Sequence, residues 1–372
     1  MGYEEFIKGV GKAAEEFCEY SREGMARVIA HFDADGISSA AILARMLSKE
    51  GRMFKLSFVS QLNKKNLEII SRERHEIVMF ADVGAGNISD IESMLKGKKV
   101  IILDHHICQK KDANATHVNP MLFGVEEKMS GSMICYLFAS SICDMREMSG
   151  IALAGAAGDG YGEGKAYERI AEDAVSEGIV EKAENSYKFK NQDEGMKDIK
   201  SFATVLNACG RLNKGAIGAG ACLGDKGMKE KAMECYDEYK AGIRKAKQWF
   251  EDNKDNNNII KGINYLIINA KDKIPGNITG TLASIISKSD NCGYVLSMGR
   301  LDESTKISLR VSGNKDADLR EIIREIIVKL GEGEFGGHKD AAGALIPISR
   351  ESGFISIAKE VLEKKGMEEM VS

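Results

Sequence analysis

Short apolar runs alternate with amphipathic stretches along the first third of the chain. The pattern predicts strands at 26–31, 54–59, 76–81, 99–103 and 116–118. Helices are predicted between them, at 37–49, 64–73 and 88–96. Alternation of strand and helix over such a span is typical of an α/β domain whose parallel sheet is covered by helices on both faces.

The rest of the chain carries different patterns. Residues 130–224 are predicted to be helical, with small residues closely spaced. Between Asp225 and Asn253, apolar residues recur at spacings of three and four, which predicts one long helix. Beyond it, strands are predicted near 263–270, 293–299, 305–311 and 342–347, with helices near 278–288, 317–329 and 353–364. We therefore predict an N-terminal domain at 1–224, a connecting helix and linker at 225–258, and a smaller C-terminal α/β domain at 259–372.

Composition places the chain among ordinary globular proteins. Its 372 residues suffice for two domains, and 43% are hydrophobic and 29% charged. The sequence shows neither a membrane-spanning run nor the features of a signal peptide, so we expect a cytosolic protein. The eight cysteines form no C-x-x-C pair, which argues against a zinc site or a disulfide framework. A net charge of −4 lacks the basic footprint of most nucleic-acid-binding proteins, although a groove can be locally basic.

Three of the predicted strands end in acidic residues. Asp33 and Asp35 follow the first strand, Asp82 follows the third, and Asp104-His105-His106 follows the fourth. Ligands of parallel sheets bind beyond the carboxyl ends of the strands. The sequence therefore predicts one carboxylate-rich pocket at that edge of the sheet.

The ligand types in this pocket indicate hard divalent cations. Carboxylate and imidazole without thiolate suit Mn²⁺ or Mg²⁺, and two such ions can clamp a phosphoryl group. Asp159 is a further candidate ligand, because glycines on both sides would let the backbone approach closely. An aspartate at a strand end is, however, often a helix N-cap, and for Asp35 this alternative stays open.

The ordered motifs around these residues resemble those of the DHH phosphoesterase superfamily. The segment from His31 to Gly36, Asp82, Asp104-His105-His106 and Asp159 occur in the order of its four motifs. The C-terminal run Gly336-Gly337-His338, with Ala341-Ala342-Gly343, is similar to the closing motif of the accompanying DHHA1 domain. The segments 206–212 and 222–225 resemble the RecJ-like branch, particularly archaeal single-strand nucleases.

This resemblance implies a hydrolase with two Mn²⁺ or Mg²⁺ ions. It places Asp33 on one ion, Asp35, His105 and Asp159 on the other, and Asp82 between the two. His31 is a further candidate ligand, which either binds an ion or lines the site. The resemblance also implies that His106 faces the scissile phosphate and that Asp104 orients the histidines.

In the C-terminal domain the resemblance implies a set of substrate-binding residues. Arg310, on the strand that also carries Ser308, would grip a phosphate of the substrate through its guanidinium. Gly336, Gly337 and His338 would contribute backbone and imidazole groups. Substrate would then lie in the cleft between the two domains.

Three functions remain open at this point. The first is an exonuclease that acts on single-stranded DNA or RNA. The second is a phosphodiesterase for short oligonucleotides or cyclic dinucleotides. The third is a replication-fork component that binds a GINS-like partner, with cleavage secondary or lost. The motif residues are all present, which disfavours a loss of cleavage; polarity, sugar preference, substrate length and oligomeric state stay open.

Overall fold

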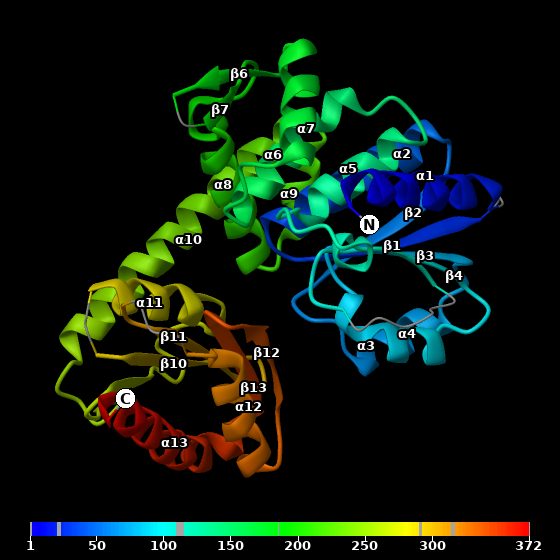
Figure 1. Ribbon diagram of the computed structural model, residues 1–372. Coiled ribbons are helices and arrows are strands. Elements are labelled where there is room, and N and C mark those ends of the chain that lie inside the picture. Colours follow the sequence, from blue (N-terminus) through cyan, green and yellow to red (C-terminus); the bar gives the residue numbers. More distant parts are fainter. Residues whose placement is uncertain are drawn as a thin grey trace. The chain divides into compact units, whose positions relative to one another are not determined.

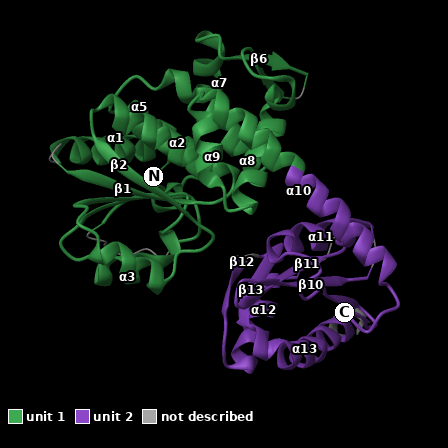
Figure 2. Ribbon diagram, turned by 180° about the vertical axis from the view of Figure 1, so that it is seen from behind, with its two compact units in different colours: residues 1–237 green, residues 238–372 purple. Residues whose placement is uncertain are grey.

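The structure is a computed structural model that describes residues 2–20, 24–108, 115–184, 186–289, 292–313 and 317–371, without the side chains of His338 and of residues 368–371. It consists of two compact units, Met1–Asp237 and Glu238–Ser372 (Figure 2). The division falls within the long helix α10 (Lys226–Asp252), which lies in the segment predicted to connect the two domains. No helix of the described residues is long and apolar enough to cross a membrane.

Five parallel strands form the sheet of the first unit (Figure 1). They are β1 (Met25–His31), β2 (Met53–Val59), β3 (Ile77–Ala81), β4 (Lys99–Leu103) and β5 (Thr116–Val118), in the order β2-β1-β3-β4-β5. Every neighbouring pair is parallel. The predicted α/β fold class is confirmed, and each predicted strand differs from the observed one by one residue at most at either end.

The helices of this unit cover both faces of the sheet. They are α1 (Tyr3–Glu19), α2 (Ala34–Lys49), α3 (Lys64–Arg72), α4 (Ile88–Met94), α5 (Gly131–Ser140), α6 (Ser149–Gly158), α7 (Lys165–Ser176), α8 (Ile199–Arg211) and α9 (Gly215–Cys222). Successive strand residues point to opposite faces. Ile29, Phe80 and Ile102 therefore pack with α3 and α4. Their sequence neighbours join the larger core that α1, α2 and α5 share. In Figure 1 these three helices lie on the side of the sheet opposite to α3 and α4.

A helix and a strand pair of the first unit are absent from the elements that the pattern predicts. No element is predicted for the N-terminal residues, yet α1 buries Phe6, Val10 and Phe17. The strands β6 (Val180–Ala183) and β7 (Ser186–Phe189) form an antiparallel pair within 130–224, so the prediction of an all-helical segment is wrong there. Each strand has only four residues, which is too short for a clear alternation of apolar and polar positions.

The second unit is built on a mixed sheet of six strands. They are β8 (Ile259–Lys261), β9 (Tyr265–Asn269), β10 (Tyr294–Leu301), β11 (Ser304–Val311), β12 (Glu334–His338) and β13 (Ala341–Pro347), in the order β12-β13-β11-β10-β9-β8. The helices are α11 (Gly276–Ser289), α12 (Leu319–Leu330) and α13 (Glu351–Val371). The two edge strands, β8 and β12, were not predicted. β12 contains Gly336 and Gly337, and glycine weakens the strand signal of a sequence.

Single turns of 3₁₀ helix complete the described elements of both units. They are η1 (Ala85–Asn87), η2 (Pro120–Phe123), η3 (Arg146–Met148), η4 (Glu194–Met196) and η5 (Ile348–Arg350).

Candidate metal centre and active site

Three neighbouring strands of the first unit bring polar residues to one end of the sheet. β1 ends in His31 and leads to Asp33, Asp82 follows β3, and Asp104 follows β4. Because β1, β3 and β4 are adjacent and parallel, their carboxyl ends lie at the same edge. Asp159 reaches the same place from the end of α6, where it lies 3.4 Å from His105.

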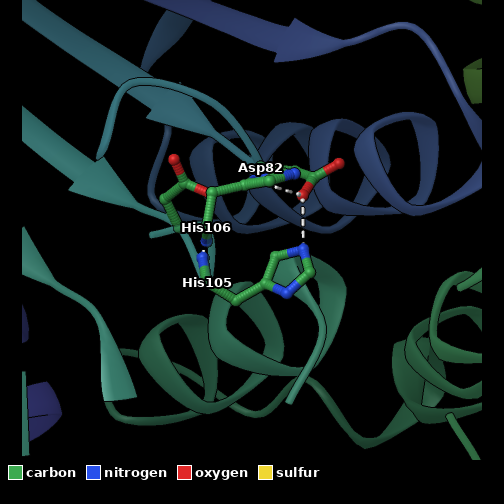
Figure 3. Close-up of side chains that lie close together, drawn as sticks. Asp82, His105 and His106 are labelled. Atoms are coloured by element: carbon green, nitrogen blue, oxygen red, sulfur yellow. Dashed lines mark hydrogen bonds and ion pairs between the residues drawn. The ribbon is translucent and has the colours of Figure 1, made fainter. Parts of the chain in front are cut away.

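Asp82 lies at the centre of these residues, with a side chain that is 2% exposed. Its Oδ1 lies 3.2 Å from His105 Nε2 and 3.8 Å from His106 Nδ1 (Figure 3). Its Oδ2 faces the other way and lies 3.5 Å from His31 Nδ1. The backbone of Asp82 has a φ of 58°, a left-handed conformation that is uncommon for residues other than glycine. Such conformations cost about 1–3 kcal/mol and gather at functional sites.

Two groups of three side chains have ligand atoms close enough to share a cation. They are His31, Asp33 and Asp82 in one group, and Asp35, His105 and Asp159 in the other. In each group the ligand atoms lie within 4.8 Å of one another. In the first, His31 Nδ1 lies 2.8 Å from Asp33 Oδ2, and in the second, His105 Nε2 lies 4.0 Å from Asp35 Oδ2. A further group, of Asp82, Asp104, His105 and His106, also has ligand atoms within this range. The two groups of three place Asp33 apart from Asp35, His105 and Asp159, as the resemblance implies, and the role of all these residues as ligands stays a prediction.

Asp104 is fully buried behind these groups and holds the histidines. Its Oδ1 accepts hydrogen bonds from the backbone N–H groups of His105 and His106, at 2.8 and 3.2 Å. The same oxygen lies 2.7 Å from His106 Nδ1, and Oδ2 accepts from the N–H of Ala85 at 2.7 Å. Burial alone would raise the pKa of Asp104, but these hydrogen bonds and the two imidazoles bring it well below its ordinary value. The contact with Asp104 sets the orientation of the His106 ring.

Asp35 is held by the start of another helix. The N–H groups of Gly131 and Ser132, in the first turn of α5, donate to its two carboxylate oxygens at 2.6 and 3.0 Å. The N-cap of α2 is Asp33, whose Oδ1 accepts from the N–H of Gly36 at 3.1 Å. The alternative that Asp35 is merely the N-cap of its own helix is therefore wrong. A helix N-terminus stabilises a negative charge, which helps to keep this carboxylate in the interior.

Gly131 packs so closely against the pocket that it leaves no room for a side chain. A Cβ atom there would lie 2.6 Å from Asp82 Cβ and 3.0 Å from Asp35 Oδ2. We expect Gly131→Ala to destabilise the fold by about 1–3 kcal/mol through overpacking. Because it displaces both carboxylates, it should also weaken Mn²⁺ binding more than about tenfold, as measured by calorimetry.

The matched control for this substitution is Gly11→Ala. Gly11 lies inside α1 and a Cβ atom there would meet nothing within 4 Å. The change should leave Mn²⁺ binding as it is and stabilise the helix by about 0.5–1 kcal/mol. If Gly131→Ala binds Mn²⁺ like the unchanged protein, Asp35 and Asp82 do not hold the cation.

The carboxylates of this pocket repel one another strongly. Burial, with the neighbouring carboxylate of Asp82, raises the pKa of Asp35 to about 7. Burial and the charges of Asp35 and Asp82 raise the pKa of Asp159 to about 9. Burial lowers the pKa of His105, but the carboxylates around it raise that pKa to about 10 overall. The raised pKa values of Asp35 and Asp159 show that the carboxylate charges of the pocket are not fully offset by the groups around them. A bound cation would offset them.

The polar atoms of the pocket fit a divalent cation. Within the described part of the chain, His31 Nδ1, Asp82 Oδ1 and His105 Nε2 are buried and make no hydrogen bond. His105 Nε2 nevertheless lies 3.2 Å from Asp82 Oδ1, and His31 Nδ1 lies 2.8 Å from Asp33 Oδ2. A buried polar atom without a hydrogen bond is costly, so it usually has another partner. Carboxylate oxygens with imidazole nitrogens and no thiolate suit Mn²⁺ or Mg²⁺. These acidic clusters can therefore bind metal.

Two residues beside the pocket were not assigned to it from the sequence. Asn207 Oδ1 accepts a hydrogen bond from the N–H of Ala34 at 3.0 Å. Arg211, one turn further along α8, has its guanidinium 5.2 Å from the centroid of the Phe32 ring. Burial raises the pKa of Asp33, but His31 and, to a smaller extent, Arg211 lower it below its ordinary value. The segment 206–212 was noted for its resemblance, but nothing in its pattern connects it with residues 32–34.

In the second unit, sheet register aligns most of the expected substrate-binding residues. Ser308 pairs with Gly343, and Gly343 pairs with Gly336 on the next strand. Gly337 adopts a φ of 127°, which only glycine readily adopts. Arg310 Nε donates to Ser284 Oγ of α11 at 3.0 Å, which holds the guanidinium against that helix. The remaining candidate is His338, whose backbone belongs to β12 and whose side chain lies outside the described residues.

Comparison with known families assigns both units. Residues 26–157 match the DHH family, N-terminal domain, and residues 262–364 match the DHHA1 domain. The chain contains a DHH domain followed by a DHHA1 domain. The resemblance inferred from the motifs is thereby confirmed, and the sheet edge described above belongs to the DHH domain.

Relatives of this DHH/DHHA1 protein include two curated proteins. An uncharacterized protein of Methanocaldococcus jannaschii is 36% identical over 162 residues, 41% of this chain and 37% of that protein. The single-stranded-DNA-specific exonuclease RecJ of Thermus thermophilus is 29% identical over 139 residues, 35% of this chain and 21% of RecJ. The aligned segments thus span well under half of either relative.

The fold is also that of solved RecJ structures. The crystal structure of RecJ in complex with Mn²⁺ from Thermus thermophilus aligns with a TM-score of 0.75 and 18% identity. The alignment covers 96% of this chain and 55% of the RecJ chain. It shows that the DHH/DHHA1 chain has the same fold over nearly its whole length.

Proposed function

We propose that this chain is a divalent-cation-dependent phosphodiesterase that removes nucleotides from an end of single-stranded DNA or RNA. The observation that carries the proposal is the position of Asp82, whose two oxygens face two separate groups of ligand atoms. A carboxylate between two cation sites is the arrangement expected for two-metal phosphoryl transfer. The relationship to a single-stranded-DNA-specific exonuclease supports the choice of substrate.

The residues of the pocket have separate roles in this proposal. His31 and Asp33 would hold one cation, Asp35, His105 and Asp159 would hold the other, and Asp82 would contact both. When bound, the cations offset the charge of the phosphoryl group and lower the pKa of the attacking water. Manganese is the ion that we expect to serve best, with magnesium as the alternative.

His106 is proposed to act on the substrate directly. Its Nδ1 faces Asp104 at 2.7 Å, so its Nε2 is the atom that would meet a phosphate oxygen. A donor held rigidly in this way stabilises charge that develops on the scissile phosphate. Asp104 is then a positioning residue, because it acts through the ring that it holds.

Arg310 is proposed to hold a phosphate of the strand through the second unit. Its side chain is partly exposed, and hydrogen bonds from Nε to Ser284 Oγ and from Nη1 to Leu309 O hold the guanidinium in one orientation. We expect Arg310→Ala to raise KM for a short single strand about tenfold or more, because a charge-assisted contact is lost. Mn²⁺ binding should stay as it is, since Arg310 is no part of the cation pocket.

The matched control for Arg310 is Arg320→Ala, an exposed arginine at the start of α12. It should leave KM and kcat unchanged. Wild-type kinetics for Arg310→Ala, measured in steady state, would exclude the proposed phosphate contact.

One gel experiment tests the proposed function. Single strands of DNA and RNA, labelled at either end, are digested with Mn²⁺ and compared with double strands of the same sequence. Stepwise shortening of a single strand from one end is the expected result. Cleavage of only dinucleotides and cyclic dinucleotides would establish the small-substrate alternative instead.

The absence of any cleavage with Mn²⁺ would favour the third possibility, a replication component without catalytic activity. Binding of a GINS-like partner in addition to cleavage stays a prediction from the resemblance. A pull-down with purified GINS subunits, with and without Mn²⁺, tests it separately from hydrolysis.

A further inference from the structure

A cavity of about 950 Å³ opens in the first unit beside the cation pocket. Its walls come from the turn after α6, from α7, from the β6–β7 pair and from α8, which lie close together in Figure 1. Gly158 and Gly160, the two neighbours of Asp159, line the cavity. Asn207, which binds the backbone of Ala34, lines it as well. The cavity therefore lies beside the site at the sheet edge, although none of the assigned ligands lines it.

Three tyrosines give this cavity its chemical character. Tyr161 lies between the two sites, because its ring centroid is 6.0 Å from that of His105 and it also lines the cavity. Further from the pocket, Tyr167 and Tyr187 lie with their ring centroids 6.3 Å apart. Aromatic rings along a groove are the platforms on which proteins stack the bases of single strands.

The charged residues of the cavity balance one another. They are three lysines, Lys128, Lys182 and Lys200, and three glutamates, Glu163, Glu168 and Glu184. A small free anion would gain little in such surroundings, because the attraction and the repulsion offset each other. A nucleotide strand fits better, since its bases can meet the tyrosines while its phosphates meet the lysines. Lys128 already lies 5.8 Å from the ring of Tyr161, which places a cation beside the first platform.

We propose that this cavity, the tyrosine groove, binds bases of the single strand adjacent to the phosphate that is cleaved. The inference rests on the proposed function, and it specifies which surface of the first unit carries the strand. Tyr161 would stack the base nearest to the scissile bond, and Tyr187 would stack a base further along. Lys182 would contact a phosphate between them.

The β6–β7 pair supplies a matched set of variants. Lys182 and Tyr187 are register partners and both line the groove. Glu181 and Lys188 are the adjacent partners, so their side chains point to the opposite face. Lys188→Ala thus removes a lysine from the same two strands without changing the groove, and it is the control for Lys182→Ala.

The test measures binding without cleavage. Fluorescence anisotropy of a labelled oligothymidylate of about 12 nucleotides in EDTA gives Kd for each variant, at several salt concentrations. Tyr187→Ala should raise Kd about tenfold, whereas Tyr187→Phe, which keeps the ring, should not. Lys182→Ala should raise Kd and lower the slope of log Kd against log salt by about 0.7, the value for one phosphate contact on a single strand. Lys188→Ala should match the unchanged protein in both respects.

The outcomes separate the groove from the function. Suppose that the unchanged protein binds the oligonucleotide and cleaves it with Mn²⁺. If Tyr187→Ala and Lys182→Ala then bind it as tightly as Lys188→Ala does, the groove assignment is overturned and the proposed function stands. If the unchanged protein neither binds nor cleaves the strand, the proposed function is refuted, and the groove proposal is refuted with it. Thermal unfolding of each variant identifies any change that disrupts the β6–β7 pair. In that case Lys182→Ala, an exposed position, decides the question.

Discussion

Asp82→Asn is expected to lower kcat for oligonucleotide hydrolysis by about a thousandfold or more. The substitution removes the negative charge of the carboxylate that lies between the two proposed cation sites. Asparagine preserves the size of the side chain. It also tolerates the left-handed backbone at this position, where φ is 58°, better than alanine does. The variant should therefore fold normally, and steady-state kinetics with Mn²⁺ then report the loss of the carboxylate alone.

A second left-handed aspartate provides the control for this prediction. Asp302, with a φ of 52°, lies in the exposed turn between β10 and β11. Asp302→Asn makes the same chemical change on the same backbone conformation, far from the pocket in sequence, and should leave kcat as it is. A folded Asp82→Asn protein that keeps a tenth of the original rate would disprove the central role of Asp82.

Mn²⁺ should raise the melting temperature of the protein, because a cation relieves the repulsion among the buried carboxylates. At a concentration about 100 times Kd the stabilisation is about 2.7 kcal/mol, or about 5–10 °C for a unit of this size. EDTA should reverse the shift and abolish hydrolysis. Ca²⁺, which prefers more oxygen ligands at longer distances, should give a smaller shift and restore less activity.

The Asp82→Asn protein tests this second prediction without any catalytic readout. Its melting temperature in EDTA should equal or exceed that of the unchanged protein, since one repelling charge is gone. Its response to Mn²⁺ should be much smaller. An unchanged protein whose melting temperature does not respond to millimolar Mn²⁺ would contradict the metal centre itself.

The parallel sheet and its acidic edge could be predicted because local pattern and chemistry coincide there. Each strand is a short apolar run, and Asp33, Asp82 and Asp104 follow directly where the run ends. Parallel topology then brings those ends together without further information. Ser308 and Gly336 follow a different course, because they were expected together only from the family resemblance. Antiparallel register aligns them through Gly343, on a strand pair of which β12 was not predicted.

The parts that could not be predicted depend on packing between distant segments. Asp35 is held by N–H groups that lie 96 and 97 residues away, at Gly131 and Ser132. Backbone amides carry no sequence signal, so only the small residues of this segment hinted at a close approach. The contact of Asn207 with Ala34, 173 residues apart, is hidden for the same reason. The β6–β7 pair was missed because strands of four residues leave too little pattern.

The residues proposed to bind the cations are far apart along the chain, and this affects the rates of folding and unfolding. Asp35, His105 and Asp159 become neighbours only after the sheet and α6 have packed together. Contacts of such long range form late in folding, so a ligand that needs them stabilises the native state more than the transition state. Manganese should accordingly lower the unfolding rate of the first unit and leave its refolding rate nearly unchanged. Stopped-flow unfolding with and without the ion would show this as a longer native lifetime.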